Sequence, residues 1–316
     1  MSNTPMAQPM RALLGAINAL GKLHVGPTME SFLRKPYAER IANENPALMT
    51  RKVTATIDTE DVQVEGRGGP IHTRIYRRPD TAPGAPGYLF IHGGGFAAGG
   101  VNFCDHVCRE LADRSGFVVI GLSYRLAPEH PFPAGIEDCQ DVLTWMAKEA
   151  PGGLDPDRIA IGGESAGGNF TALLALWSRD HNGPRLAHHA PIYPLTDFTT
   201  SSIDWSEGNA GNPGVTPKVA ETMVAMYCTD IDPADPLVSP AFADHKDLPP
   251  ALVVTCQYDV LRNEGVALAA SYRDAGVEVK HLHMDDMPHG YLLMTRLTKR
   301  SYETMDLMIA EANRYL

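Results

Sequence analysis

The sequence predicts an α/β fold in which helices flank a mostly parallel central sheet and a helical cap lies over the carboxyl ends of its strands. Short continuous apolar runs, typical of strands buried on both faces, alternate with stretches of helical periodicity. Of the 316 residues, 44% are hydrophobic and 21% charged, so the chain can bury a large core within one α/β domain.

The alternation assigns an element to most of the chain. Six apolar runs are predicted to be strands of the parallel sheet: Tyr88–Ile91, Phe117–Leu122, Arg158–Ile161, Ala187–Tyr193, Ala251–Thr255 and Val277–Leu282. The predicted helices span residues 102–114, 134–149, 167–180 and 262–275, with a closing helix around Met305–Ala312. Upstream, polar and apolar residues alternate from Val53 to Tyr76 around a glycine-rich turn, which predicts antiparallel strands.

Two segments fall outside the strand–helix alternation. Prolines divide residues 1–50 into short helical pieces, and residues 196–235 combine several Gly and Asp residues with a predicted helix at Pro217–Tyr227. Ligands of such sheets bind beyond the carboxyl ends of the strands, where an insertion would cover them. We therefore expect residues 1–50 and 196–235 to form the cap, and residues 51–195 and 236–316 to form the α/β domain.

The composition argues against several partners and compartments. A net charge of -11 repels nucleic acid, and no basic cluster offsets it. No apolar run approaches the ~18 residues of a membrane span. The helical spacing of Leu13, Ile17 and Leu20 favours an amphipathic N-terminal helix over a signal peptide. The five cysteines, odd in number and without a C-x-x-C pair, favour buried thiols and a cytoplasmic location.

The run Gly163–Gly167 reads Gly-Glu-Ser-Ala-Gly and lies between a predicted buried strand and a predicted helix. This is the context of a nucleophile elbow, a tight turn that lifts a serine hydroxyl above the sheet. The helix that follows presents free N–H groups and a positive dipole end to an anion that develops there. Ser165 is therefore predicted to be a nucleophile.

A serine hydroxyl is a weak nucleophile until a base removes its proton. On a fold with such an elbow, the expected chain order is Ser, then an acid, then His. Asp259 follows the predicted strand Ala251–Thr255, and His289 follows the last predicted strand. We predict that His289 is the base, and that Asp259 holds its tautomer and stabilises the imidazolium.

Other acidic and imidazole groups compete for these two roles. His281 and His283 lie inside the predicted last strand, where a structural role suits them better. Glu264 falls in the predicted helix that follows Asp259. Asp285 and Asp286 lie close to the favoured histidine in sequence, and Asp286 could instead shape the loop before it.

The run His92–Phe96 contains three consecutive glycines and directly follows the first parallel strand. Backbone N–H groups must meet the charge that develops on a carbonyl oxygen under attack, and glycines let the main chain approach without Cβ obstruction. We expect the N–H groups of Gly94, Gly95 and Ala166 to form an oxyanion hole. A merely flexible glycine loop is the alternative. His92 is expected to order the loop rather than act as a base.

These motifs together resemble the hormone-sensitive-lipase-like serine esterases, or bacterial esterase family IV, of the α/β-hydrolase superfamily. His92–Phe96 resembles the family's HGGG motif, Tyr124–Glu129 its YRLAPE segment, and Gly163–Gly168 its GDSAGG motif. Asp259–Arg262 is similar to its DPLR motif and His289–Tyr291 to its HGF motif. Five motifs in the right order make the resemblance specific.

The resemblance spans residues 85–300 and implies the α/β-hydrolase fold, a cap, no metal or other cofactor, and a small-molecule ester as the partner. It implies a carboxylesterase that hydrolyses short- to medium-chain acyl esters through a Ser-His-Asp triad and an acyl-enzyme intermediate. Relatives are often dimers, so a homodimer is compatible with it. Four departures from the motifs, none of which removes a catalytic group, are Ser123, Glu164, Val260 and Asn263.

Two alternatives to an esterase stay open. The same triad cleaves amides and lactones, so an amidase or lactonase is one of them. The other is a ligand-binding receptor, but the receptors that resemble this family lack the catalytic histidine, whereas His289 is present. Phe96, Trp205, Met223 and Met226 are candidates for the acyl pocket, although apolar residues of a cap often serve packing alone.

Overall fold

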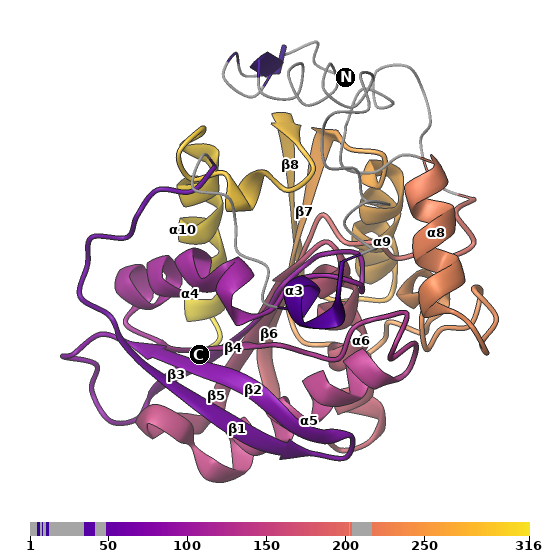
Figure 1. Ribbon diagram of the computed structural model, residues 1–316. Helices are drawn as coiled ribbons and strands as arrows, with labels where there is room; N and C mark the ends of the chain where they lie inside the picture. Colours follow the sequence, from indigo (N-terminus) through magenta and orange to yellow (C-terminus); the bar gives the residue numbers. More distant parts are fainter. Residues whose placement is uncertain are drawn as a thin grey trace.

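The computed structural model describes residues 5–6, 8, 11–12, 35–41, 49–201, 203 and 217–316. The described residues form a sheet of eight strands in the order β1-β2-β4-β3-β5-β6-β7-β8 (Figure 1). The strands are β1 (Asp58–Gly66), β2 (Gly69–Arg77), β3 (Ala85–Ile91), β4 (Val118–Leu122), β5 (Leu154–Glu164), β6 (Leu186–Ile192), β7 (Ala251–Tyr258) and β8 (Val279–Pro288). The pairings β1–β2 and β2–β4 are antiparallel, and all others are parallel.

Helices cover both faces of this sheet. The α-helices in the described residues are α3 (Tyr37–Ile41), α4 (Val101–Ser115), α5 (Ala134–Glu149), α6 (Ala166–Asp180), α8 (Pro217–Tyr227), α9 (Arg262–Asp274) and α10 (Arg300–Asn313). Helices α4 and α10 pack on one face, and α5, α6 and α9 pack on the other (Figure 1). Successive residues of β3 alternate between the two cores: Leu89 and Ile91 join the α5–α6 side, while Tyr88 and Phe90 join the α4–α10 side.

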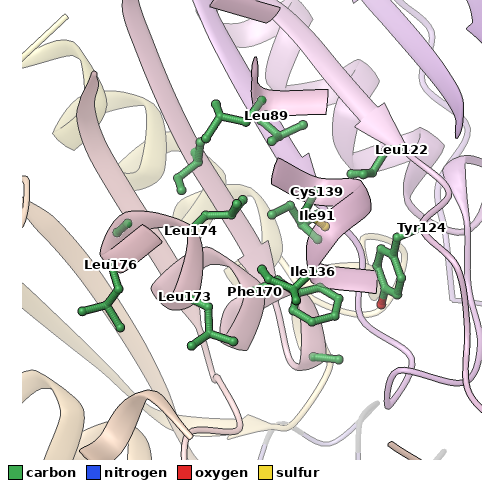
Figure 2. Close-up of a cluster of buried hydrophobic side chains, with 14 of the residues drawn as sticks. Leu89, Ile91, Leu122, Tyr124, Ile136, Cys139, Phe170, Leu173, Leu174 and Leu176 are labelled. Atoms are coloured by element: carbon green, nitrogen blue, oxygen red, sulfur yellow. The ribbon is translucent and has the colours of Figure 1, made fainter. Parts of the chain in front are cut away.

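The core on the α5–α6 side fixes the helix that follows Ser165. Leu89 and Ile91 of β3 gather with Ile136 of α5 and with Phe170 and Leu174 of α6 (Figure 2). All five side chains are at most 4% exposed. Burial of a side chain of this size contributes about 1.5–3 kcal/mol, so the start of α6 is held firmly against the sheet.

The predicted α/β fold is confirmed, and the largest differences in strand extent are at β5 and β8. Strand β5 begins at Leu154 rather than Arg158, and β8 continues to Pro288 rather than ending at Leu282. The carboxyl-terminal part of β8 includes Asp285 and Asp286, which interrupt the apolar pattern. Because β8 is an edge strand of the sheet, its side chains need not all be buried. The strand therefore continues beyond its run of apolar residues.

The predicted helix at Pro217–Tyr227 is present as α8. The amphipathic helix expected around Leu13–Leu20 and the candidate pocket residue Trp205 lie outside the described residues. Within the described ranges, no helix combines the length and apolar character needed to cross a membrane. All five cysteines are free thiols, four of them buried.

Candidate active site

Ser165 lies in the turn between β5 and α6 with φ 58° and ψ −118°, a strained conformation for a residue with a side chain. Its neighbouring glycines have no room for a Cβ. A Cβ at Gly163 would lie 2.4 Å from the Gly167 carbonyl oxygen, and a Cβ at Gly167 would lie 2.1 Å from the Ile91 carbonyl oxygen. The strand–turn–helix therefore has the geometry of a nucleophile elbow.

Ser165, Asp259 and His289 lie together although 124 and 30 residues separate them from one another along the chain. They follow the carboxyl ends of β5, β7 and β8, which run parallel in one sheet. His289 Nε2 is 2.9 Å from Ser165 Oγ, and His289 Nδ1 is 2.8 Å from Asp259 Oδ2. Asp259 is fully buried, and its Oδ1 accepts a hydrogen bond from the Leu261 N–H at 2.9 Å.

The surroundings of His289 set its tautomer and its pKa. The Asp259 carboxylate can only accept, so Nδ1 carries the hydrogen and Nε2 is free to accept the Ser165 hydroxyl proton. Burial lowers the pKa of His289, but the charge of Asp259 and its hydrogen bond raise it more, and the net shift is upward. The Tyr193 ring, 4.8 Å away between centroids, packs against the imidazole.

The rival acids and bases make other contacts. His281 Nε2 and His283 Nδ1 lie 2.8 and 2.9 Å from Thr255 Oγ1, within the β7–β8 pair. Asp286 was expected in a loop, but it lies in β8 and accepts a hydrogen bond from Arg300 Nε at 3.1 Å. The longer strand β8 thus removes this carboxylate from the loop it was expected to shape.

Glu264, the remaining rival, lies in α9 and is fully buried. Its Oε2 accepts hydrogen bonds from the backbone N–H groups of Thr196 and Asp197. Burial raises the pKa of Glu264 to about 8, although these two hydrogen bonds oppose the shift. The carboxyl group therefore ties the chain beyond β6 to α9.

The glycine loop, residues 93–99, leaves the carboxyl end of β3. Gly94 has φ 117° and Gly95 has φ 60°, conformations that L side chains rarely adopt. Within the described part of the chain, the N–H groups of Gly94, Gly95 and Ala166 have no hydrogen-bond acceptor. Three unpaired donors from the glycine loop and the first turn of α6 are what an oxyanion hole requires.

Two buried side chains order the start of the glycine loop. Glu164, which precedes the elbow serine, accepts a hydrogen bond from the Gly93 N–H at 2.7 Å, and burial raises its pKa. His92 Nδ1 lies 2.6 Å from the Gly93 carbonyl oxygen, and its ring stacks on Tyr124 at 4.1 Å. Burial lowers the pKa of His92 to about 4, so the imidazole is neutral at pH 7. This arrangement matches the ordering role expected for His92.

The candidates for the acyl pocket occupy different places. Met223 of α8 is 7% exposed, and a Cβ at Gly95 would lie 2.3 Å from its Cε, so it touches the glycine loop. Phe96 is 1% exposed and packs against the Tyr227 ring at 4.3 Å and other aromatic rings, which is a core position. Met226 is partly buried against the same core.

Several contacts of the site were not predicted from the sequence. They are the Glu164–Gly93 hydrogen bond, the packing of Tyr193 on His289, and the contacts of Arg40 with the glycine loop. An acidic residue at the end of a buried strand was a signal for the first, because a buried carboxylate needs donors. No sequence pattern indicates the other two.

Among the described residues, no three His, Cys, Asp or Glu side chains gather as they would around a metal ion. The donors and acceptors of the site are side chains and backbone N–H groups of the chain itself. The arrangement can therefore activate a hydroxyl and receive negative charge on a carbonyl oxygen with its own groups.

A family model described as alpha/beta hydrolase fold matches residues 88–293, more than half of the chain. The chain belongs to this family. Within it, the relatives place the chain among the hormone-sensitive-lipase-like esterases, and by this homology it is a carboxylic ester hydrolase.

The relatives match most of this esterase. The carboxylesterase NlhH of Mycobacterium tuberculosis is 35% identical over 252 residues, which cover 78% of this chain and 79% of NlhH. An ethyl acetate hydrolase of Pseudomonas putida is 30% identical, covering 87% of this chain and 88% of its own. The solved esterase of Pyrobaculum calidifontis is 32% identical, covers 98% of both chains and superposes with a TM-score of 0.82.

Proposed function

We propose that this esterase hydrolyses short- to medium-chain acyl esters through a Ser165–His289–Asp259 triad and an acyl-enzyme intermediate. The unbroken hydrogen-bond chain from Ser165 Oγ through both ring nitrogens of His289 to Asp259 carries the proposal. Nucleophile, base and orienting acid are thus within direct reach of one another, as acyl transfer demands.

In the first half of the reaction, Ser165 Oγ bonds to the ester carbonyl carbon while its proton moves to His289 Nε2. The imidazolium lies against Asp259, whose charge stabilises it. His289 then gives the proton to the departing alcohol oxygen as the ester C–O bond breaks. In the second half, water loses a proton to His289 and attacks the acyl carbon. The bond between this carbon and Ser165 Oγ then breaks as His289 returns the proton to Oγ, which releases the acid and restores the serine hydroxyl.

The negative charge of each tetrahedral intermediate develops on the former carbonyl oxygen. We assign its stabilisation to the N–H groups of Gly94, Gly95 and Ala166, for which no acceptor is found among the described residues. Removal of one such donor from an oxyanion hole costs on the order of 10²–10³ in kcat.

We assign residues 1–50 and 196–235 to a cap over the site, above the α/β domain of residues 51–195 and 236–316. The contact of Met223 with Gly95 supports this, because it brings α8 to the glycine loop. Met223 is then placed to limit the acyl chain, whereas Phe96 and Met226 shape the pocket only through packing. The ethyl acetate hydrolase among the relatives supports a preference for short esters.

Other substrates, another function, the location and the oligomeric state bear on the same proposal. Amide and lactone substrates require the same groups and are therefore alternatives within the same mechanism. A non-catalytic receptor is disfavoured by His289, which is present and hydrogen-bonded to Ser165. The five free thiols support a reducing cytoplasm, and a homodimer is a proposal that size-exclusion chromatography with light scattering would check.

A p-nitrophenyl ester series from C2 to C16 tests the function, with wild type, Ser165→Ala and Ser115→Ala compared. Ser115 is the matched control because, among the described residues, its hydroxyl bonds to the end of α4 and to the turn after it. We expect a maximum at short or medium chains, a loss on the order of 10⁵-fold or more in Ser165→Ala, and wild-type turnover in Ser115→Ala. Equal turnover by Ser165→Ala and wild type would refute the triad, and a maximum at long chains would identify a lipase.

A further inference from the structure

Arg40 is a fully buried cation outside the proposed triad and oxyanion hole. It lies in the last turn of helix α3 and is 1% exposed. Arginine is among the residues least often buried completely, since removing its charge from water costs several kcal/mol unless hydrogen bonds compensate. The contacts of Arg40 therefore indicate what its burial stabilises.

The Arg40 guanidinium joins two loops through one nitrogen. Nη1 donates to the Ala97 carbonyl oxygen and to the Ala127 carbonyl oxygen, both at 2.8 Å. Ala97 belongs to the glycine loop, and Ala127 belongs to the loop after β4. Nη2 donates to the carboxylate of Glu129, which supplies the counter-charge.

The backbone of α3 also contacts the end of the glycine loop, near Ala97. The Gly99 N–H donates to the Arg40 carbonyl oxygen at 3.0 Å. A Cβ at Gly100 would lie 2.2 Å from the Ile41 carbonyl oxygen, so the two chain segments are in close contact. The α3 helix and the returning limb of the glycine loop are thus fastened by side chain and main chain together.

These contacts continue to the proposed oxyanion donors. The Ala97 N–H donates to the Gly94 carbonyl oxygen at 3.2 Å and closes the turn that contains Gly94 and Gly95. The Ala127 N–H donates to the Phe96 carbonyl oxygen at 2.9 Å, so the second loop supports the same turn. Arg40 donates to a carbonyl oxygen in each of the two loops, so its replacement would let the turn at Gly94 and Gly95 move.

We propose that Arg40 is a positioning residue that holds the oxyanion turn in place, and that docking of α3 therefore controls turnover as well as covering the site. The proposal rests on the proposed function, since it assigns a role to the N–H groups of Gly94 and Gly95. Glu164 fixes the outgoing end of the glycine loop, and Arg40 fixes its returning end. The turn between these two ends directs the Gly94 and Gly95 N–H groups toward the oxyanion only while both ends of the glycine loop are held.

A planar fork is needed for this role. Arginine presents several N–H donors in a fixed geometry, whereas lysine is a single charged point on a flexible stem. Lysine could reach Glu129 and one carbonyl oxygen, but it could not span both carbonyl oxygens and the carboxylate in the same way. Methionine would fill a similar volume and leave the two carbonyl oxygens without a donor.

The experiment compares Arg40→Met and Arg40→Lys with Arg74→Met in p-nitrophenyl acetate hydrolysis and thermal unfolding. Arg74 is the matched control because it also bridges two elements, through Asp61 and Asp105, away from the glycine loop. The third readout is the inhibition constant of a trifluoromethyl ketone, whose adduct with Ser165 carries the oxyanion. Ser165→Ala in the same assay tests the triad separately from Arg40.

We expect kcat of Arg40→Met to fall on the order of 10- to 100-fold, as for displaced catalytic groups, with KM little changed. The inhibition constant should rise by the same factor, and Arg40→Lys should fall between wild type and Arg40→Met. If Arg40→Met does not fold, Arg40→Lys alone must show both the lower kcat and the higher inhibition constant. A kcat within twofold of Arg74→Met, or an unchanged inhibition constant, would overturn the proposal even if Ser165→Ala is inactive.

Discussion

The triad and the glycine loop reach the same site by different means. Ser165, Asp259 and His289 each follow a strand of one parallel sheet, so the ladder of hydrogen bonds between strands places them. The glycine loop has no ladder of its own and is held by single contacts from Glu164, Arg40 and Met223. The position of the proposed nucleophile and base is therefore built into the sheet, whereas the position of the proposed oxyanion hole depends on segments far away in sequence.

The largest effect on kcat is expected from the residues that follow the strands of the sheet. Asp259→Asn removes the charge and replaces one carboxylate oxygen with an NH2 donor. The remaining oxygen is needed by the Leu261 N–H, so the NH2 group faces His289 and its tautomer is no longer held. Comparable changes lower kcat about 10⁴-fold. Asp259 also raises the pKa of His289, and the base acts only when unprotonated. Loss of the Asp259 charge should therefore lower the pKa of His289 and move the acidic limb of the kcat/KM profile to lower pH.

Asp286→Asn is the control for this experiment, because Asp286 is the nearby rival acid and pairs with Arg300 instead. It should keep wild-type turnover and an unshifted acidic limb. Equal losses in the two variants, or an acidic limb that moves upward in Asp259→Asn, would contradict the assignment of Asp259.

The glycine loop should show two kinds of sensitivity in one turn. In Gly94→Ala the new Cβ would lie 2.1 Å from the Ala98 carbonyl oxygen, a backbone atom that cannot yield, so kcat should fall on the order of 10²–10³-fold. In Gly95→Ala the nearest atom is the flexible end of Met223, at 2.3 Å. Met223→Ala should therefore restore part of the loss in Gly95→Ala and none in Gly94→Ala.

A double-mutant cycle on hydrolysis of a C4 p-nitrophenyl ester measures this coupling. Coupling of Met223→Ala with Gly95→Ala alone would sharpen the contrast between the rigid and the cap-dependent contacts of the loop. The absence of coupling in both pairs would show that α8 does not bear on the turn in solution.

The smallest effect is expected at Glu264, which ties the chain beyond β6 to α9 and should influence stability rather than chemistry. Its pKa is about 8 when folded and near 4.5 as an ordinary glutamate, so the folded state binds the extra proton between these values. The stability from this group is present below pH 4.5 and is lost as pH rises through 8, by on the order of 1 kcal/mol per pH unit at most.

Glu264→Gln keeps an acceptor for the Thr196 and Asp197 N–H groups but does not titrate. Urea unfolding at pH 5 to 8.5 should show wild type losing more stability with rising pH than Glu264→Gln, while kcat of the two proteins stays similar. Parallel stability curves would contradict the role of this carboxyl group.

Much of the site was accessible from the sequence because its residues lie next to strands. The glycines around Ser165 and the positions of Asp259 and His289 after apolar runs were enough to predict the triad and its order. The boundary of β8 was not, because an edge strand tolerates polar residues and its pattern stops before Pro288. The expected loop position of Asp286 failed for that reason.

The amino-acid sequence by itself determined the α/β alternation, the elbow at Ser165 and the chemical groups available for acyl transfer, because these depend on local periodicity and on glycines that no other residue can replace. Only the tertiary structure decided that Arg40 and Met223 contact the glycine loop. Such contacts join segments tens of residues apart, and packing against the sheet, which no local pattern encodes, brings them together.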